Sequence, residues 1–446
     1  MLALNNNLLD HIKTELTKQY YALNNKCALL HCKVEIKGLT PLQFLKCASL
    51  TDCMYLEDRA GTFSSAGIGS AVCFSSDNYI DFTNDMQKMQ VILQNTCADL
   101  RFYGGLAFDI NRPVSNSWSQ FGVYRFHIPR FECRSTSNNR VSLMVTIADT
   151  PDYKAEIDAA VQDLKGIFAE AEHNTDQGLS ADHIQVHKRT YSPDQQNWIK
   201  TASDIIDMYD QDLTKVVLAC KETLHLSKSV NAVDLFQGIM SRGPAYKFFF
   251  SYNGSVFMGA SPECLYQRDG SKLFTEALAG TCAGDDIDLL RSDKDNLEHD
   301  YVVRDMHEAL KSICTKVFQS EPKELLVWQN LTHLRSKFQG DIAENIMDMH
   351  ILAALHPSAA VLGYSRNTAW SVLREYEPFD RGWYAGPVGY IGKNTSMFAV
   401  AIRSALVYGK TLELFAGAGI VRGSDVQNEF NEVCSKMQQY HETLGI

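Results

Sequence analysis

The chain of 446 residues contains no run of 18 apolar residues, no basic block and no Cys-x-x-Cys pair. A membrane-spanning helix needs such an apolar run. A nucleic-acid interface needs clustered positive charge, whereas this chain has a formal net charge of −11. We therefore expect no membrane association and no DNA or RNA binding. Because the first 30 residues also lack the apolar core of a signal peptide, the sequence predicts a cytoplasmic protein.

The twelve cysteines are scattered singly, and no Cys/His group has the spacing of a zinc site. Several of them, such as Cys73 and Cys220, lie within apolar runs. We interpret these cysteines as buried thiols in a reducing compartment.

Hairpin signals alternate with helical segments in the second half of the chain. Asn253-Gly254 separates two strand-like runs, Asp269-Gly270 repeats the pattern, and Gly409-Lys410 predicts a third turn. A long helix is predicted over residues 294–318, where apolar residues recur at helical spacing. Hairpins mixed with long helices are typical of an α+β protein with large antiparallel sheets.

The chain is predicted to have two portions. Residues 151–212 are polar and helical, with a loop at 175–178, and this is the best candidate for a seam. Strands are predicted over 141–149 before the seam and 213–220 after it. We therefore expect an N-terminal α+β portion at 1–190 and a catalytic portion at 191–446, both belonging to the same fold.

The segment from Ala416 to Met437 is the most informative one. After an apolar run with Gly417 and Gly419, a predicted helix places Glu429, Glu432 and Lys436 along one stripe beside an apolar stripe. Backbone N–H groups at small residues suit a ligand carboxylate, and paired carboxylates suit a hard divalent cation. The alternative is a surface amphipathic helix with solvated charges.

Two further residues could move protons. Lys215 opens the strand KVVLAC, where desolvation would favour the neutral amine that a general base requires. Glu263 follows Pro262 among apolar residues, where burial would favour a protonated carboxyl able to act as an acid. The alternatives are a strand-end lysine that reaches solvent and an exposed glutamate in a turn.

Asp295 and Glu298 lie three residues apart at the start of the long helix and share a face. Acidic residues are also simply favourable at a helix N-terminus, so this alternative stays open. Arg403 lies inside FAVAIRSAL, which is predicted to be an apolar strand, where an unpaired charge is costly and an anionic partner is expected. Arg381 and Tyr384 belong to a segment too rich in glycine and aromatic residues for an ordinary loop.

Eight ordered motifs together resemble the chorismate-utilising enzymes, a superfamily that includes isochorismate, salicylate, anthranilate and aminodeoxychorismate synthases. The resemblance is dense over 200–440 and weaker before that. The motifs are KVVLAC, GASPECL, EALAGT, KDNLEH, LHPSAAVLG, FDRGWYAGPVG, AIRS, and AGAGIVRGSD followed by NEFNEVCSK. The fold implied by this resemblance has large antiparallel sheets packed face to face and flanked by helices.

The resemblance also implies roles for individual residues. Glu298 and Glu432 match the direct Mg²⁺ ligands, and Asp295 and Glu429 match acidic positions one helical turn before them, which support the ligands. Lys215 matches the general base and Glu263 the general acid. The positions that match substrate-binding groups are Gly280, Thr281, His356, Tyr384, Arg403, Gly417, Ala418, Gly419 and Lys436.

Within this family, FDRGWYAGPVG and LHPSAAVLG are most similar to the motifs of the isochorismate synthases, and the N-terminal 200 residues, with FYGGLAFD, resemble the menaquinone-pathway form. Ala279 stands where aminodeoxychorismate synthases often carry a lysine, and Lys215 is present where anthranilate synthases lack a base. The implied activity is Mg²⁺-dependent conversion of chorismate to isochorismate by a monomer or weak homodimer. Salicylate synthase and a non-catalytic chorismate-binding protein are the alternatives.

Overall fold

The computed structural model describes most of the chain, and all structural statements below concern the described part. It comprises residues 6–22, 29–48, 52–96, 99–138, 140–148, 150–173, 184–241, 243–283, 287–320, 322–328 and 331–446. Within this part, no helix is long and apolar enough to cross a bilayer.

The strands form two antiparallel limbs that diverge at β5 (Tyr124–Ser135), which pairs with β3 along one edge and with β4 and β6 along the other. The first limb runs β1, β6, β5, β3, β2, β9, β10, β19, β20, β8, and β7 and β16 both flank β8. The second runs β4, β17, β18, β11, β12, β15, and β13 and β14 both flank β15.

The strand bounds are β1 (Leu30–Ile36), β2 (Cys53–Glu57), β3 (Ser64–Ser76), β4 (Arg101–Leu106), β6 (Val141–Ile147), β7 (Val186–Ser192), β8 (Lys215–Leu226), β9 (Tyr246–Tyr252), β10 (Ser255–Ser261), β11 (Cys264–Asp269), β12 (Lys272–Ala283), β13 (Cys314–Gln319), β14 (Glu324–Trp328), β15 (Leu331–Ile342), β16 (Gly363–Tyr364), β17 (Pro387–Gly392), β18 (Thr395–Val400), β19 (Ser404–Tyr408) and β20 (Thr411–Val421).

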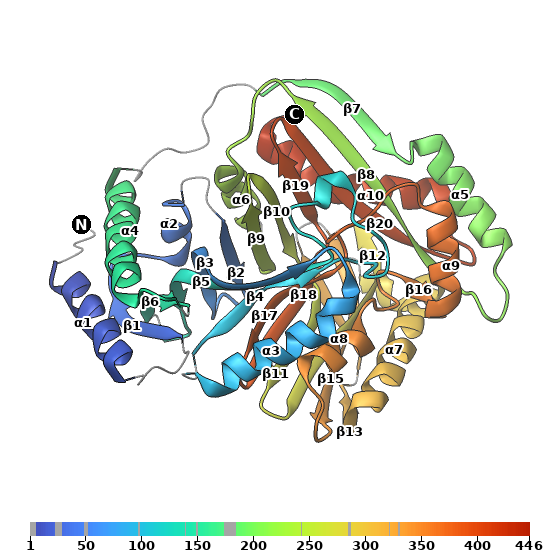
Figure 1. Cartoon of the computed structure of the whole chain (residues 1–446). Coiled ribbons are helices and arrows are strands. Elements are labelled where there is room, and N and C mark those ends of the chain that lie inside the picture. The colour runs from blue at the N-terminus through green and yellow to red at the C-terminus, as the bar shows by residue number, and fades with distance from the viewer. Residues whose placement is uncertain are drawn as a thin grey trace.

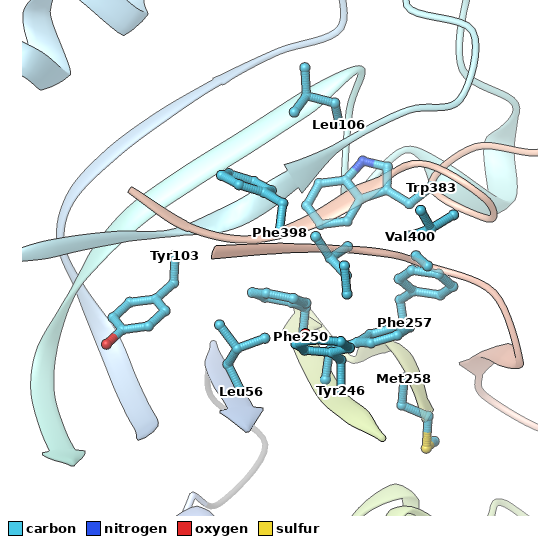
Figure 2. Packing of buried hydrophobic residues seen from close by; sticks show 14 of the residues in the cluster. Leu56, Tyr103, Leu106, Tyr246, Phe250, Phe257, Met258, Trp383, Phe398 and Val400 are labelled. Atoms are coloured by element: carbon cyan, nitrogen blue, oxygen red, sulfur yellow. The ribbon is translucent and has the colours of Figure 1, made fainter. Parts of the chain in front are cut away.

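The two limbs pack face to face over an aromatic core. Figure 2 shows Phe250 and Phe257 of the first limb facing Trp383 and Phe398, from the loop before β17 and from β18. The ring centroids of Phe250 and Trp383 lie 5.9 Å apart in an edge-to-face contact. Burying each such ring contributes roughly 1.5–3 kcal/mol, so this layer holds the limbs together. The predicted α+β fold with face-to-face antiparallel sheets is confirmed.

Helices cover the outer faces of the limbs (Figure 1). The helices α1 and α4 pack at the end formed by β1 and β6, α7 packs on β12 and β15, and α10 packs on β20. The helix bounds are α1 (Asn6–Ala22), α2 (Pro41–Leu45), α3 (Phe82–Asn95), α4 (Tyr153–His173), α5 (Gln195–Asp207), α6 (Ala232–Met240), α7 (Asp293–Ile313), α8 (Asp348–Leu355), α9 (Arg366–Tyr376) and α10 (Val426–Leu444).

The three predicted hairpins are confirmed. Asn253 and Gly254 adopt φ values of 47° and 80° between β9 and β10, the left-handed pair that a tight two-residue hairpin requires. Gly270 and Gly409 also have positive φ at the turns β11–β12 and β19–β20. Local turn chemistry therefore sets these strand registers.

Two other predictions were wrong in detail. The helix predicted to reach residue 318 ends at Ile313, because residues 314–319 pair with β15 as β13. Arg403 does not lie within a strand, because β18 ends at Val400 and β19 begins at Ser404. The strand β18 belongs to the second limb and β19 to the first, so Arg403 occupies a crossover between them.

The predicted seam contains α4 and α5, but β7 lies between them and pairs with β8, so the segment is not wholly helical. The loop predicted at 175–178 lies outside the described residues. The division into 1–190 and 191–446 stays a prediction.

The interpretation of the cysteines holds for most of those described. Six are buried, including Cys220, whereas Cys314 and Cys434 are half-buried. Cys73 is exposed on β3, which corrects its predicted burial.

Candidate active site

The helix α10 forms one wall of an open cleft of about 790 Å³, a volume that includes space continuous with solvent. Asp425 caps the helix by accepting a hydrogen bond from the Asn428 backbone N–H at 3.0 Å. The predicted stripe of Glu429, Glu432 and Lys436 lines the cleft. The neighbouring apolar stripe is buried against β20 and α5, so the helix is not a solvated surface element.

The helix α7 forms the facing wall and adds Asp295 and Glu298 to the same cleft. Ser292 caps this helix through the backbone N–H of Asp295. Four carboxylates from the first two turns of two helices therefore meet in one cleft. The structure brings together all four positions that the resemblance implies for the metal site.

Each of three carboxylates is paired with a lysine. The Nζ atom of Lys294 lies 2.5 Å from Glu429, and that of Lys436 lies 2.6 Å from Glu432. Lys215 lies 3.1 Å from Glu298. These lysines balance negative charge that would otherwise repel across the cleft.

Burial raises the pKa of Asp295 and of Glu429, and neighbouring carboxylates raise both further. A divalent cation would relieve this repulsion, and an all-carboxylate donor set suits a hard ion such as Mg²⁺. Gly419 keeps the space before Glu298 open, because a Cβ at residue 419 would lie 2.3 Å from Glu298 Oε1. Across the described chain, no three Asp, Glu, His or Cys groups converge closely enough to hold an ion alone. The residues fit an ion that takes further ligands from substrate or water.

Glu263 lies in the short connection from β10 to β11, where the chain crosses from the first limb to the second, and its side chain lines the cleft. Its side chain is buried, and burial raises its pKa to about 8 with a further contribution from the charge of Glu276. At neutral pH this carboxyl therefore carries its proton. The predicted alternative of an exposed turn glutamate is wrong.

Lys215 begins β8 and is fully buried, at 0% exposure. Its Cε atom would lie 3.0 Å from a Cβ at residue 419, so Gly419 also makes room for this side chain. The alternative of a strand-end lysine that reaches solvent is wrong, because Nζ faces Glu298 inside the protein.

Arg403 and Tyr384 line the cleft from the crossover and from the loop before β17. Burial lowers the pKa of Arg403 to about 10, although the charge of Glu432 acts in the opposite direction. The ring of Tyr384 stacks on Phe415 with centroids 5.2 Å apart. The arrangement offers a guanidinium and a phenol to an anionic ligand.

The glycine-containing end of β20 completes the cleft. β19 pairs with β20 only as far as Phe415, so among the described strands the residues after it pair with β8 alone. Gly417 and Gly419 line the cleft, and the Gly417 carbonyl accepts a hydrogen bond from Lys436 at 2.8 Å. Gly280 lines it from β12 with a φ of 75°.

Four predicted residues are not among those that line the cleft, and one of them is Lys215, whose buried amine contacts the lining residue Glu298. The other three are Thr281, His356 and Ala418. Ala418 is buried between the two glycines. His356 Nε2 lies 3.1 Å from the Phe108 carbonyl, and burial lowers the pKa of this histidine to about 4, which keeps it neutral. The backbone of Thr281 pairs with His333 across β12 and β15, and its side chain is not among those described.

Two polar side chains of the cleft were not predicted from the sequence, those of Lys294 and His333. Lys294 lies within the motif KDNLEH, so the acidic residues around it were a usable signal for a counter-charge. Arg381 is a support rather than part of the lining. It forms an ion pair with Glu377 and donates hydrogen bonds to the carbonyls of Val217 and Val361.

Two facing antiparallel limbs around a cleft with a protonated acid, a buried lysine and four carboxylates define a protein that binds a small anionic ligand. Residues 15–445 match the family model described as chorismate binding enzyme, and the chain belongs to that family. The resemblance inferred from the motifs is thereby confirmed.

Characterised relatives agree with this membership. The chain is 31% identical to the chloroplastic isochorismate synthase of Catharanthus roseus over 407 residues, covering 87% of this chain and 70% of the relative. It is 27% identical to isochorismate synthase MenF of Bacillus subtilis (strain 168) over 456 residues, covering 94% of each. The solved structure of MenF, the menaquinone-specific isochorismate synthase from Escherichia coli, superposes with a TM-score of 0.82 at 27% identity, covering 97% of this chain and 99% of that one.

Proposed function

We propose that this protein is an isochorismate synthase, which converts chorismate to isochorismate with Mg²⁺. The observation that carries the proposal is the buried Glu263, which holds a proton at neutral pH. It lines the same cleft as the four carboxylates of α7 and α10. Membership in the chorismate binding family and the similarity to isochorismate synthases support it.

The reaction needs a base and an acid because water is a weak nucleophile and hydroxide a poor leaving group. Lys215, as the free amine, takes a proton from water while the water oxygen bonds to C2 of the ring. Both ring double bonds shift by one position, from C1=C2 to C1=C6 and from C5=C6 to C4=C5, as the C4–O bond breaks. Glu263 gives its proton to the departing hydroxyl, which leaves as water. Proton return from Lys215 to Glu263 restores the starting state. The base role requires the contact of Lys215 with Glu298 to open.

Glu298 and Glu432 would hold the Mg²⁺ directly, and Asp295 and Glu429 would support them from one turn earlier on each helix. When bound, the ion would neutralise and orient a substrate carboxylate. The lysines that now pair with Glu298 and Glu432 must move aside, which leaves Lys436 available to the substrate.

The substrate is a dicarboxylate, and an acidic protein must hold it with local positive groups. We assign this task to Arg403 and Lys436, with Tyr384 and the backbone of Gly417–Gly419. Gly280, Thr281 and His356 complete the proposed set. Every residue that lines the cleft lies between Pro262 and Lys436, which supports a catalytic portion at 191–446.

We further assign the chain to the menaquinone-specific form, on its similarity over nearly its full length to relatives of that kind. A cytoplasmic location and a monomer or weak homodimer remain predictions.

The decisive experiment is incubation of the purified protein with chorismate and Mg²⁺, followed by chromatographic identification of the products. We expect isochorismate alone, and no turnover in EDTA until Mg²⁺ is restored. Release of pyruvate with salicylate would identify a salicylate synthase instead. Chorismate binding without any product in the presence of Mg²⁺ would overturn the enzymatic assignment.

A further inference from the structure

The backbone of Arg403 has an unfavourable conformation that contacts with the surrounding structure must stabilise. Its φ of 54° lies in the left-handed region, which is unfavourable for a residue other than glycine. The residue forms the corner between β18 and β19, and the same corner aims its buried guanidinium into the cleft. A group that fixes this corner therefore also fixes the guanidinium.

The Arg403 carbonyl is the point at which the corner is held. The Tyr440 hydroxyl lies 3.0 Å from this oxygen and 3.3 Å from the Met258 carbonyl. The Ala260 backbone N–H also donates to the Arg403 carbonyl, at 3.3 Å. On the β10 side the contact is close, since a Cβ on Gly259 would lie 2.9 Å from the same oxygen.

Tyr440 is well placed to transmit the position of α10 to this corner. It is 1% exposed and lies four residues after Lys436, one turn further along the same face. The helix that presents Glu429, Glu432 and Lys436 thus also holds the backbone of the guanidinium residue opposite them. The helix α10 therefore contacts the cleft both through its own charged side chains and through the backbone of Arg403.

We propose that Tyr440 is a positioning residue, whose hydroxyl holds the Arg403 corner so that the guanidinium meets a substrate carboxylate. This inference rests on the proposed function, because chorismate is taken as the ligand. Tyr440 does not itself line the cleft and contacts Arg403 only through the backbone carbonyl, so its effect should fall on binding rather than on the chemical step.

The test is the Tyr440→Phe variant, which removes only the hydroxyl. We expect KM for chorismate to rise roughly three- to tenfold, the effect of one buried hydrogen bond, with kcat changed less than about twofold. The matched control is Tyr252→Phe. Tyr252 is equally buried, and its hydroxyl lies 3.2 Å from His127 Nδ1, but neither residue lines the cleft. That variant should keep the wild-type KM.

A double-mutant cycle separates positioning from general stability. In an Arg403→Ala background, Tyr440→Phe should raise KM less than about twofold further, because the group it positions is absent. An unchanged KM in Tyr440→Phe, additive effects in the cycle, or unfolding of the single variant at the assay temperature would each overturn the inference. Wild-type protein that does not convert chorismate would instead refute the proposed function.

Discussion

Replacing Glu263 by glutamine should make the protein more stable while it abolishes turnover. Burial raises the pKa of this carboxyl from an ordinary value of 4.5 to about 8, so folding at neutral pH takes up a proton. The contribution of Glu263 to the free energy of unfolding is therefore complete below pH 4.5. Between pH 4.5 and 8 it falls by about 1.4 kcal/mol for each pH unit. Glutamine is neutral at every pH and avoids this loss.

The advantage of Glu263→Gln should therefore grow with pH. We expect the free energy of unfolding to exceed that of wild type by under ~1 kcal/mol at pH 5 and by ~3 kcal/mol at pH 7. Urea titrations of both proteins at pH 5, 7 and 8 measure this difference. A difference that does not change with pH, or a variant less stable than wild type throughout, would refute the reasoning.

Glu132 provides a control of opposite sign. It is similarly buried, but the charge of Arg134 and the hydrogen bonds that the carboxylate accepts together outweigh the effect of burial and lower its pKa. Ser65 and Tyr103 also donate hydrogen bonds to it. Glu132→Gln should therefore lower the stability at pH 7, where Glu263→Gln raises it.

Three further predictions concern turnover and metal. Lys215→Ala should abolish isochorismate formation with the circular dichroism spectrum unchanged, and full activity would exclude Lys215 as the base. Glu432→Gln should raise the Mg²⁺ concentration needed for half-maximal activity more than Glu429→Gln, since residue 432 is the proposed direct ligand. A larger effect at residue 429 would reverse that order. Gly419→Ala should reduce kcat/KM at least tenfold because its Cβ would lie 2.3 Å from Glu298 Oε1, and wild-type kinetics would contradict this tight steric fit of the cleft.

Local signals predicted the parts of the fold that local chemistry determines. Asn253-Gly254 and Gly409 specify tight turns by themselves, and both hairpins form. The end of α7 depends on a distant segment, because residues 314–319 satisfy a helical pattern but pair with β15. The position of Arg403 could not be predicted from the sequence for the same reason. It lies between β18 and β19 because these strands belong to different limbs, and the assignment of strands to limbs depends on distant pairing partners.

The candidate site was predictable where motifs carried it and not where it depends on partners far along the chain. Glu298 and Glu432 were identified through resemblance, and both line the cleft. Lys294 was missed because its partner, Glu429, lies 135 residues away. Helical spacing alone left the face of α10 undecided between solvent and ligand, and only the position of α7 opposite it resolves that choice.

The interleaving of early and late strands has a consequence for synthesis of the protein. Gly105 of β4 pairs with Val388 of β17, and Met54 of β2 pairs with Phe250 of β9. At about 5–20 residues per second, the ribosome needs roughly 15–60 s to deliver the partner of β4. One edge of β4 stays unpaired on the nascent chain during that time, and one edge of β2 stays unpaired until β9 has been synthesised. We therefore expect productive folding to be post-translational and sensitive to chaperone supply.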